Sequence, residues 1–561
     1  MIDRRRTAKD VKMSLTDPPL AAVSASAPKN AGGAAAAEGE FSRRRTFAVI
    51  SHPDAGKTTL TEKLLLFGGA INLAGEVKAR KNGIQTRSDW MSIERERGIS
   101  VVTSVMTFEY GGCVFNLLDT PGHEDFSEDT YRTLTAVDAA VMVIDAAKGI
   151  EARTRKLFEV CRLRDIPIVT FINKLDRDGR DPFDLLDEIE KMLALDTAPV
   201  TWPIGSGKSF AGTYSLATKT VRRLDNDAEL ISVSGPDDPL FASLLPASEL
   251  EPWRESVMLA EEGCKPFDLA AFREGHLTPV FFGSALRNFG VRDLIDAMAA
   301  YAPSPRGQET DKRVVEASEP RMTGFVFKIQ ANMDPNHRDR IAFMRVCSGR
   351  LSRGMKAKLV RTGKPISLNT PQFFFAQDRS IADEAWAGDV VGLPNHGTLR
   401  IGDTITEGED IRFRGVPSFA PEILRRITLQ DAMKAKKLRE ALQQLAEEGV
   451  VQLFVPNDGS GAIVGVVGAL QLDVLAARLK AEYGLPVGYD TSRFTLCRWI
   501  TARDPKKLEA FIERHASAIA TDLDGAPVFL APSPFSLQYD AERFPDITFS
   551  DVKDYQKAPA A

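Results

Sequence analysis

The sequence lacks the main features of secreted and membrane proteins. Its five cysteines are an odd number without a CxxC pair, which argues against a disulfide framework and a zinc site. No run of eighteen apolar residues occurs, so a membrane-spanning helix is not expected. The arginines at positions 4–6 are not followed by an apolar segment, so an ordinary signal peptide is not expected. We therefore expect a cytoplasmic protein with no membrane partner.

An excess of positive charge is also missing. The formal net charge is −5 over 561 residues, so no global basic field indicates nucleic-acid binding, and we expect no DNA partner. The length is sufficient for three or four domains with their own apolar cores. Residues 1–40 are rich in Ala, Ser and Pro and predict a disordered tail, although a start codon assigned too early would give the same pattern.

Residues 41–306 alternate short apolar runs with amphipathic helical periods. Near-continuous apolar strands between helices predict an α/β domain with a mostly parallel sheet covered on both faces. Ligands of such sheets bind at the carboxyl ends of the strands. The interval 197–278 breaks the alternation and is predicted to be an insertion. The predicted strands are Phe47–Ile50, Val114–Leu118, Ala139–Ile144, Ile166–Ile172 and Pro279–Phe282.

The second half of the chain has a different pattern. Residues 312–410 contain closely spaced alternating strands with Gly turns, which predict a small β-barrel. Residues 415–561 are predicted to form an α+β ferredoxin-like domain, in the order strand, helix, strand, strand, helix, strand. Phe494–Ile500 is predicted to be the last of these strands. Asp504 and Pro505 then predict the start of one more helix.

A phosphate-binding loop is predicted directly after the first apolar strand. The sequence Gly56-Lys57-Thr58 opens an amphipathic helix, and backbone N–H groups at a helix start favour an anion. Lys57 would reach the β- and γ-phosphates, and the Thr58 hydroxyl would bind Mg²⁺. The usual pattern has Gly where this chain has Ser51, so the first turn must accept a side chain. The residues expected to bind nucleotide here are Ser51, His52, Pro53, Asp54, Ala55, Gly56, Lys57, Thr58 and Thr59.

A second motif, Asp119-Thr120-Pro121-Gly122-His123, follows the second apolar strand. An Asp at the end of a strand beside a phosphate loop can bind Mg²⁺, usually through water. The amide of Gly122 can approach a γ-phosphate because no Cβ obstructs it. His123 is placed where a side chain can orient an attacking water. All five residues are therefore predicted to lie at the nucleotide.

A third motif, Asn173-Lys174-Leu175-Asp176, indicates which base is bound. The Asp176 carboxylate can accept two N–H groups from guanine, whereas adenine would leave it unpaired. The backbone at Ser284 and Ala285, after the last apolar strand, is predicted to bind the guanine carbonyl. The ligands expected are therefore GTP and GDP with Mg²⁺.

A possible second phosphate loop at Gly205-Ser-Gly-Lys208-Ser209 is rejected. Trp202 stands where the pattern requires Gly, and no strand is predicted to lead into it. We predict an ordinary turn inside the insertion.

The three motifs together resemble the guanine-nucleotide domain of the translational GTPases. Arg95-Glu-Arg97-Gly98-Ile99-Ser100 resembles their first switch segment, which makes Ser100 a further expected Mg²⁺ ligand, although elongation factors usually have Thr there. From residue 41 onward the chain resembles the bacterial release factor 3 family. An elongation factor G would continue with two further domains, and an elongation factor Tu would end in a second barrel. The stretches that carry the resemblance to release factor 3 are Ser51–Thr58, Pro203–Lys208, Phe325–Asp334 and Asn395–Thr398.

This resemblance implies a monomeric, ribosome-stimulated GTPase that converts GTP and water to GDP and phosphate. Such a protein would bind the ribosome during termination and promote the departure of decoding (class I) release factors after peptide release, without reading stop codons. His123, Lys57 and Gly122 would be the catalytic residues. Three alternatives remain open: an elongation-type or ribosome-rescue GTPase, a metabolic GTPase such as the regulatory subunit of sulfate adenylyltransferase, and a nucleotide-binding scaffold without hydrolysis.

Overall fold

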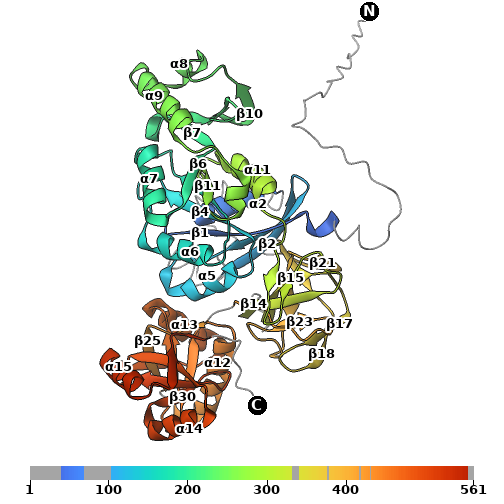
Figure 1. Ribbon diagram of the computed structural model, residues 1–561, viewed down its shortest axis with the longest axis vertical. Helices are drawn as coiled ribbons and strands as arrows, with labels where there is room; N and C mark the ends of the chain where they lie inside the picture. The colour runs from blue at the N-terminus through green and yellow to red at the C-terminus, as the bar shows by residue number, and fades with distance from the viewer. Residues whose placement is uncertain are drawn as a thin grey trace, which may run out of the picture.

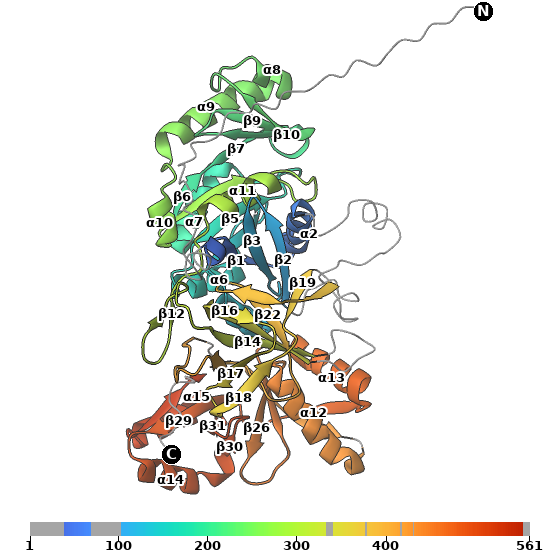
Figure 2. The same ribbon diagram turned by 90° about the vertical axis from the view of Figure 1, so that its right-hand side faces the viewer.

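The computed structural model describes residues 39–68, 103–331, 340–375, 378–415, 418–429 and 431–553. Figure 1 shows a small sheet with α9 at one end of the molecule and the C-terminal units at the other. Figure 2 shows the barrel strands between the nucleotide domain and these C-terminal units. The expected tail up to residue 38 and the expected Mg²⁺ ligand Ser100 lie outside the described residues.

A seven-stranded sheet forms the centre of the first domain, in the order β2-β3-β1-β4-β5-β11-β6. All neighbouring strands are parallel except β2, which is antiparallel to β3. The predicted mostly parallel sheet is thus confirmed. Its strands are β1 (Arg44–Ser51), β2 (Ser104–Tyr110), β3 (Cys113–Asp119), β4 (Ala139–Asp145), β5 (Ile168–Asn173), β6 (Asp196–Pro199) and β11 (Leu277–Phe282).

Helices cover both faces of this sheet because the side chains of β1, β3, β4 and β5 are apolar on both sides. One face packs on α2 (Lys57–Phe67) and α11 (Val291–Tyr301). The other packs on α5 (Ser127–Leu134), α6 (Ala152–Arg162) and α7 (Pro182–Leu193). A short 3₁₀ helix, η2 (Glu124–Phe126), leads into α5.

The insertion is a four-stranded antiparallel sheet, β10-β9-β8-β7, with helices beside it. Strand β6 pairs with β11 in the main sheet, so the inserted sheet begins only at β7. Trp202, Tyr214 and Trp253 join its core to that of the main sheet. Its elements are β7 (Thr201–Ile204), η3 (Gly207–Ser209), β8 (Gly212–Ser215), β9 (Thr220–Arg223), β10 (Asn226–Ser232), α8 (Leu240–Leu244), α9 (Ala247–Gly263) and α10 (Leu269–Arg273).

The predicted barrel is an eight-stranded sheet in the order β18-β17-β23-β14-β15-β22-β19-β20, accompanied by the pair β16-β21. Its interior is apolar, and phenylalanines of β14 and β15 on its outer side pack against the nucleotide domain. Its strands are β14 (Thr323–Ala331), β15 (Arg340–Ser348), β16 (Arg350–Ser352), β17 (Met355–Leu359), β18 (Lys364–Leu368), β19 (Gln372–Phe375), β20 (Asp378–Ile381), β21 (Glu384–Trp386), β22 (Val390–Pro394) and β23 (Thr404–Thr406), preceded by the hairpin β12 (Gln308–Glu309) and β13 (Val314–Val315).

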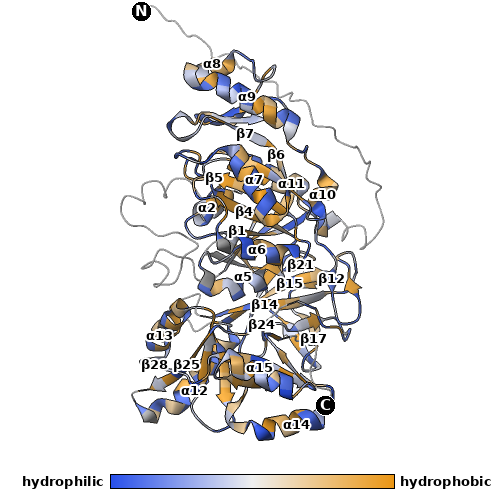
Figure 3. Ribbon diagram, turned by 60° about the vertical axis from the view of Figure 1, so that its left-hand side comes forward, coloured by the Kyte–Doolittle hydropathy of each residue, from blue (hydrophilic) through white to orange (hydrophobic). Residues whose placement is uncertain are grey.

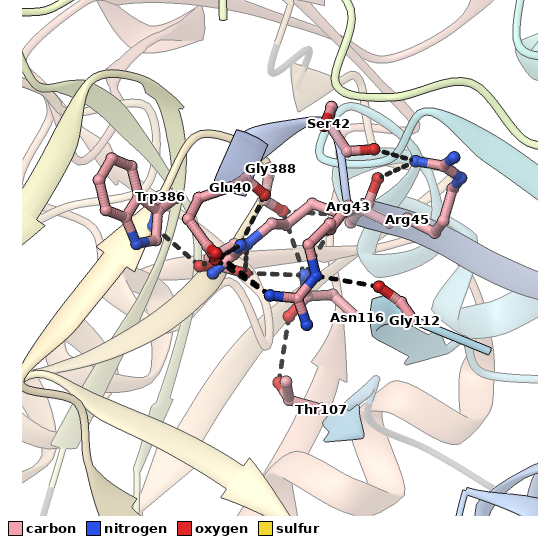
Figure 4. A network of polar contacts seen from close by, with 12 residues as sticks. Glu40, Ser42, Arg43, Arg45, Thr107, Gly112, Asn116, Trp386 and Gly388 are labelled. Atoms are coloured by element: carbon pink, nitrogen blue, oxygen red, sulfur yellow. Dashed lines mark hydrogen bonds and ion pairs between the residues drawn. The ribbon is translucent and has the colours of Figure 1, made fainter. Parts of the chain in front are cut away.

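A buried polar network joins the barrel to the amino-terminal half of β1 (Figure 4). Arg44 Nε donates to both carboxylate oxygens of Asp389 at 3.3 Å. Thr46 Oγ1 donates to the carbonyl of Gly388 at 2.5 Å, and Asn116 Nδ2 donates to the same carbonyl at 3.3 Å. The same β1 strand therefore holds the barrel near its start and runs into the predicted phosphate loop at its end.

The C-terminal part contains two βαββαβ units, where the sequence predicted one. In the first unit the strand order is β28-β25-β27-β26, and in the second it is β32-β29-β31-β30. Both are the ferredoxin-like order. Their elements are β25 (Ile423–Leu429), η4 (Ala432–Lys434), α12 (Ala435–Glu447), β26 (Gln452–Pro456), β27 (Ile463–Val466), α13 (Ala469–Tyr483) and β28 (Val487–Thr491), followed by β29 (Leu496–Ala502), α14 (Pro505–Arg514), η5 (Ala516–Ala518), β30 (Ile519–Thr521), β31 (Pro527–Ala531), α15 (Pro534–Arg543) and β32 (Ile547–Ser550).

The predicted last strand of the single unit, Phe494–Ile500, was wrongly assigned. The segment forms most of β29 and pairs with β31 and β32, while the polar edge strand β28 completes the first unit beside β25. The predicted helix start at Asp504 is confirmed, since its carboxylate accepts the amide N–H of Lys506 at 3.0 Å. In Figure 3 the outer helices α14 and α15 carry both colours, as amphipathic helices do.

The two C-terminal units form one sheet. Strand β26 pairs antiparallel with β30, in the register Val455↔Thr521 and Pro456↔Ala520. A further short pair, β24 (Ser418–Phe419) with β33 (Val552–Lys553), joins the beginning of this region to its end.

Candidate nucleotide-binding site

The predicted phosphate loop connects the central strand β1 to helix α2. Two of its residues have positive φ, Asp54 at 64° and Gly56 at 96°. A Cβ at Gly56 would lie 2.4 Å from Asn173 Nδ2, so only glycine fits there. Among the described residues, no side chain caps the N-terminus of α2, and no acidic residue lies in its first turn. This helix end therefore retains its preference for an anion.

The serine that replaces the usual first glycine is accommodated without strain. Ser51 is the last residue of β1 and is buried. Its hydroxyl donates to the carbonyl of His52 at 2.9 Å. A side chain at this position is thus compatible with the turn that follows.

His52 is buried beside the loop after β4. Its Nδ1 lies 3.2 Å from the Glu151 carboxylate, but neither ring nitrogen has a hydrogen bond of good geometry to a residue that the structure describes. Burial lowers the pKa of His52 from its ordinary value, although the charge of Glu151 acts in the opposite direction. The ring is therefore held in its neutral form at neutral pH.

Lys57 and Asp119 form a buried ion pair at the centre of the site. Lys57 Nζ donates to Asp119 Oδ1, and Thr61 Oγ1 donates to the same oxygen at 3.2 Å. Thr58 lies next to Lys57 in the first turn of α2 and is half-buried. A cation, the Thr61 hydroxyl and a carboxylate thus meet where phosphate and Mg²⁺ were predicted, and Thr58 lies beside them in the chain. The donors fit these groups, because Lys suits a phosphate oxygen and hard oxygen ligands suit Mg²⁺.

The second predicted motif passes over the phosphate loop. Thr120 Oγ1 donates to the carbonyl of Val49 at 2.8 Å, which fixes the start of the turn to β1. A Cβ at Gly122 would lie 4.0 Å from the Cα of Pro53, so the two loops are adjacent. His123 is about one-third exposed, and its Nδ1 accepts the backbone N–H of Asp125 at 3.3 Å.

The third motif is assembled from the ends of β5 and β11. Asn173 Oδ1 accepts the amides of Lys174 and Ala285, both at 2.9 Å, and its Nδ2 donates to the carbonyl of Ala55 at 2.8 Å. Ser284 Oγ donates to Asp176 Oδ1 at 2.5 Å. One amide side chain therefore connects the predicted base-binding loop to both the phosphate loop and the loop after β11.

Lys174 has a partner at the end of β4. Its Nζ donates to Asp145 Oδ2 at 2.8 Å and to the carbonyl of Asp54. Burial raises the pKa of Asp145, but the hydrogen bonds from Lys174 and from the amide of Ala147 outweigh it, and the net pKa is lowered. The lysine stem is thus held across the loop, with φ at 73° for its own backbone.

The glycine-rich turn at residues 205–209 packs against this base-binding loop. The N–H of Gly207 donates to the carbonyl of Leu175 at 2.9 Å. Contrary to the prediction, a strand does lead into the turn, namely β7. Only the three-residue η3 follows it, and a helix long enough to bind phosphate is missing from this described segment. The turn therefore packs on the predicted base-binding loop and does not have the strand-loop-helix form of a second phosphate site.

Sequence reasoning missed two residues of this region. Thr61 follows Lys57 by one helical turn, so the spacing alone places both on the same face of α2. Asp125 contacts helix α13, which begins more than 340 residues later, and no local pattern indicates that contact.

Three family models match consecutive parts of the chain. The elongation factor Tu GTP binding domain matches residues 42–304, elongation factor G domain 2 matches residues 321–408, and the class II release factor RF3 C-terminal domain matches residues 413–541. A crystal structure of a protein from Thermus thermophilus is similar, with a TM-score of 0.66 and 25% identity, over 82% of this chain and 69% of that chain. Among the described helices, none is both long and apolar enough to cross a bilayer.

Proposed function

The chain belongs to the translational GTPases and carries the C-terminal domain of release factor 3, and we propose that it promotes the dissociation of decoding release factors from the ribosome after peptide release. The observation that carries this proposal is the match of residues 413–541 to the release factor domain, on the same chain as a GTP-binding domain. An elongation-type or metabolic GTPase would not be expected to carry that domain. In this proposal the protein acts in the cytoplasm, as a monomer, and does not read stop codons.

Phosphate binding is assigned to the start of α2. The uncapped helix end and Lys57 supply positive potential at one place, and the absence of a Cβ at Gly56 lets the loop pass close to Asn173. On nucleotide binding Lys57 would exchange its partner Asp119 for a phosphate oxygen. The nearby carboxylate then becomes available for a cation.

Bound Mg²⁺ would neutralise charge that develops on the phosphates during transfer. Thr58 and Asp119 are the described residues proposed to hold it, Asp119 usually through water, together with Ser100 from the segment outside the described residues. Thr61 would keep the Asp119 carboxylate oriented through its 3.2 Å hydrogen bond.

Guanine selection is assigned to Asp176. Its carboxylate can accept the two N–H groups that guanine presents and adenine lacks. Ser284 donates to that carboxylate at 2.5 Å, and Asn173 accepts the backbone N–H of Lys174 in the same loop and of Ala285 in the loop after β11. The base pocket is thus preorganised by side chains that do not themselves read the base.

His123 is proposed to orient the attacking water. It is partly exposed and follows Gly122, which is adjacent to the phosphate loop. Positioning of water and electrostatic stabilisation are the main contributions to phosphoryl transfer in this class of enzyme. The histidine should therefore matter for turnover and little for nucleotide affinity.

The test uses ribosomes stalled on a stop codon after peptide release, carrying a fluorescently labelled decoding release factor. We expect this protein with GTP to accelerate loss of the label, and the His123→Ala variant to bind GTP normally but fail in ribosome-stimulated hydrolysis. Stimulated hydrolysis without acceleration of release would retain the translational GTPase and contradict the termination role. A protein inert in both measurements would instead support a metabolic GTPase.

A further inference from the structure

The loop that carries His123 is attached to the first C-terminal unit through Asp125. Asp125 Oδ2 accepts the backbone N–H of Leu470 at 2.7 Å. Leu470 is the second residue of α13, and an N-cap side chain accepts this same amide in ordinary helices. The residue at the N-cap position is Gly468, which has no side chain to do so. Asp125 therefore caps α13 from a different domain.

The fit at this junction is close. A Cβ at Gly468 would lie 2.0 Å from the Cγ of Asp125, so any side chain there would displace the carboxylate. The φ of Gly468 is −142°, a backbone conformation that alanine also adopts. The constraint on position 468 is thus the carboxylate of Asp125 and not the backbone.

The same residue holds His123. The backbone N–H of Asp125 donates to His123 Nδ1 at 3.3 Å, and its Oδ1 lies 3.4 Å from that nitrogen. Asp125 is buried, with 9% of its surface exposed. One buried residue thus contacts the imidazole through its backbone and one carboxylate oxygen, and the helix through the other oxygen.

The helix that follows Asp125 is docked on the same C-terminal region (Figure 1). Its contacts are polar and aromatic and come from one face of α5. Among them are Ser418 Oγ to Glu128 Oε1 at 3.2 Å, the rings of Tyr131 and Phe419 at 5.4 Å, and Arg132 Nη1 to the carbonyl of Gly449 at 3.5 Å.

We propose that Asp125 is a positioning residue that couples the orientation of His123 to the placement of α13. When the C-terminal unit sits on η2 and α5, the cap on α13 fixes the Asp125 backbone, and that backbone fixes the imidazole. When the unit moves away, the carboxylate loses the Leu470 amide and the histidine loop is released. The inference rests on the proposed role of His123 in hydrolysis.

The first test changes position 468, which is remote in sequence from the nucleotide motifs. In Gly468→Ala the new methyl group displaces the Asp125 carboxylate, and we expect kcat of ribosome-stimulated GTP hydrolysis to fall about tenfold, the effect of losing one hydrogen bond to a charged group. The Kd for GTP should stay within about twofold, because no phosphate- or base-binding residue changes. Gly461→Ala is the matched control, since a Cβ there would meet no atom of the described residues within 4 Å.

The second test measures coupling between the two positions. Asp125→Ala should also lower kcat, and the double variant with Gly468→Ala should be no worse than Asp125→Ala alone, since the methyl group then meets no carboxylate. Asp125→Asn should restore most of the activity, because its amide oxygen can still accept the Leu470 N–H. If Asp125 served stability alone, these substitutions would lower the unfolding temperature. They would then not show a non-additive loss of kcat that Asp125→Asn rescues.

The outcomes separate the inference from the proposed function. If His123→Ala abolishes stimulated turnover while Gly468→Ala, folded by circular dichroism, has the wild-type kcat, the coupling is refuted and the role of His123 stands. Multiplicative losses in the double variant would also refute the coupling. If His123→Ala turns over normally, both the histidine role and the inference fail.

Discussion

Asn173 donates its side-chain amide to the carbonyl of Ala55 across 2.8 Å, and the same nitrogen lies 2.4 Å from the position a Cβ of Gly56 would take. The predicted base-binding loop and the predicted phosphate loop are therefore joined by this hydrogen bond and by the one from Lys174 Nζ to the carbonyl of Asp54. A change in either loop is expected to affect the other, which makes the site a single unit rather than two independent subsites.

Gly56→Ala should abolish tight nucleotide binding. The φ of 96° is unfavourable for alanine, and the added methyl group would displace Asn173. Strain of this kind costs about 1–3 kcal/mol, so we expect a loss of affinity of at least tenfold even before the base-binding loop moves. Titration with a fluorescent GDP analogue measures this affinity. Unchanged affinity would mean that the loop has a different conformation in solution.

Asp176→Asn should change base preference. The amide can donate to the 2-oxo group of xanthine but cannot accept two N–H groups from guanine, so GTP affinity should fall by about 10⁴ and xanthosine triphosphate should bind better. Competition binding with both nucleotides provides the measurement.

Ser284→Ala is the matched comparison for that variant. It removes the hydrogen bond that orients the Asp176 carboxylate and the longer one, 3.3 Å, that the Ser284 hydroxyl accepts from the backbone N–H of Arg287. We expect the affinity for GTP to fall less, by about tenfold, and the preference for guanine to be retained. A switch to xanthine in this variant would contradict the assignment of base reading to Asp176.

Arg345→Met should destabilise the contact between barrel and nucleotide domain. Arg345 and Asp138 are 1% and 0% exposed, and Nη2 donates to Oδ2 at 2.7 Å. Removing one partner of a buried pair costs about 3–5 kcal/mol because the other charge stays buried. Urea unfolding measures this loss. Adding Asp138→Asn should restore part of the lost unfolding free energy. If it restores none, the destabilisation comes from lost packing and not from the unpaired charge.

Unfolding free energy should depend on pH through His52. Burial lowers the pKa of this group below its unfolded value of about 6.5, so the folded protein resists the proton that the unfolded chain accepts. Stability is therefore fully present above pH 6.5 and falls as the pH is lowered from there to the folded pKa, by up to about 1.4 kcal/mol per pH unit. Comparing urea unfolding at pH 7.5 and 5.5 for wild type and His52→Asn tests this. If the unfolding free energies of wild type and His52→Asn change equally between the two pH values, the pH dependence comes from other groups.

The first two domains were predictable because their signals are local. Apolar runs such as Val114–Leu118 lie inside the observed strands, and the alternation of strand and helix sets the parallel sheet. The motifs follow those strands directly, so they meet at one sheet edge. The individual roles of Lys57, Thr58, Asp119, His123 and Asp176 stay predictions.

The C-terminal part was harder because its pairing is not local. Strand β28 has no buried residue and lacks an apolar run, so the apolar segment of β29 was taken as its replacement. Whether β29 closes one unit or opens another depends on its partners β31 and β32, which come later in the chain. The contact between Asp125 and Leu470 was beyond sequence reasoning for the same reason.

The shared sheet of the two C-terminal units also determines how this region can be divided. In separate units β26 and β30 would each present a row of unpaired backbone groups, which invites pairing with other chains. Fragments cut between β28 and β29 should therefore aggregate or form dimers through these strands. A fragment that includes both β24 and β33 would keep every one of these pairings, which makes it the natural choice for isolating the region.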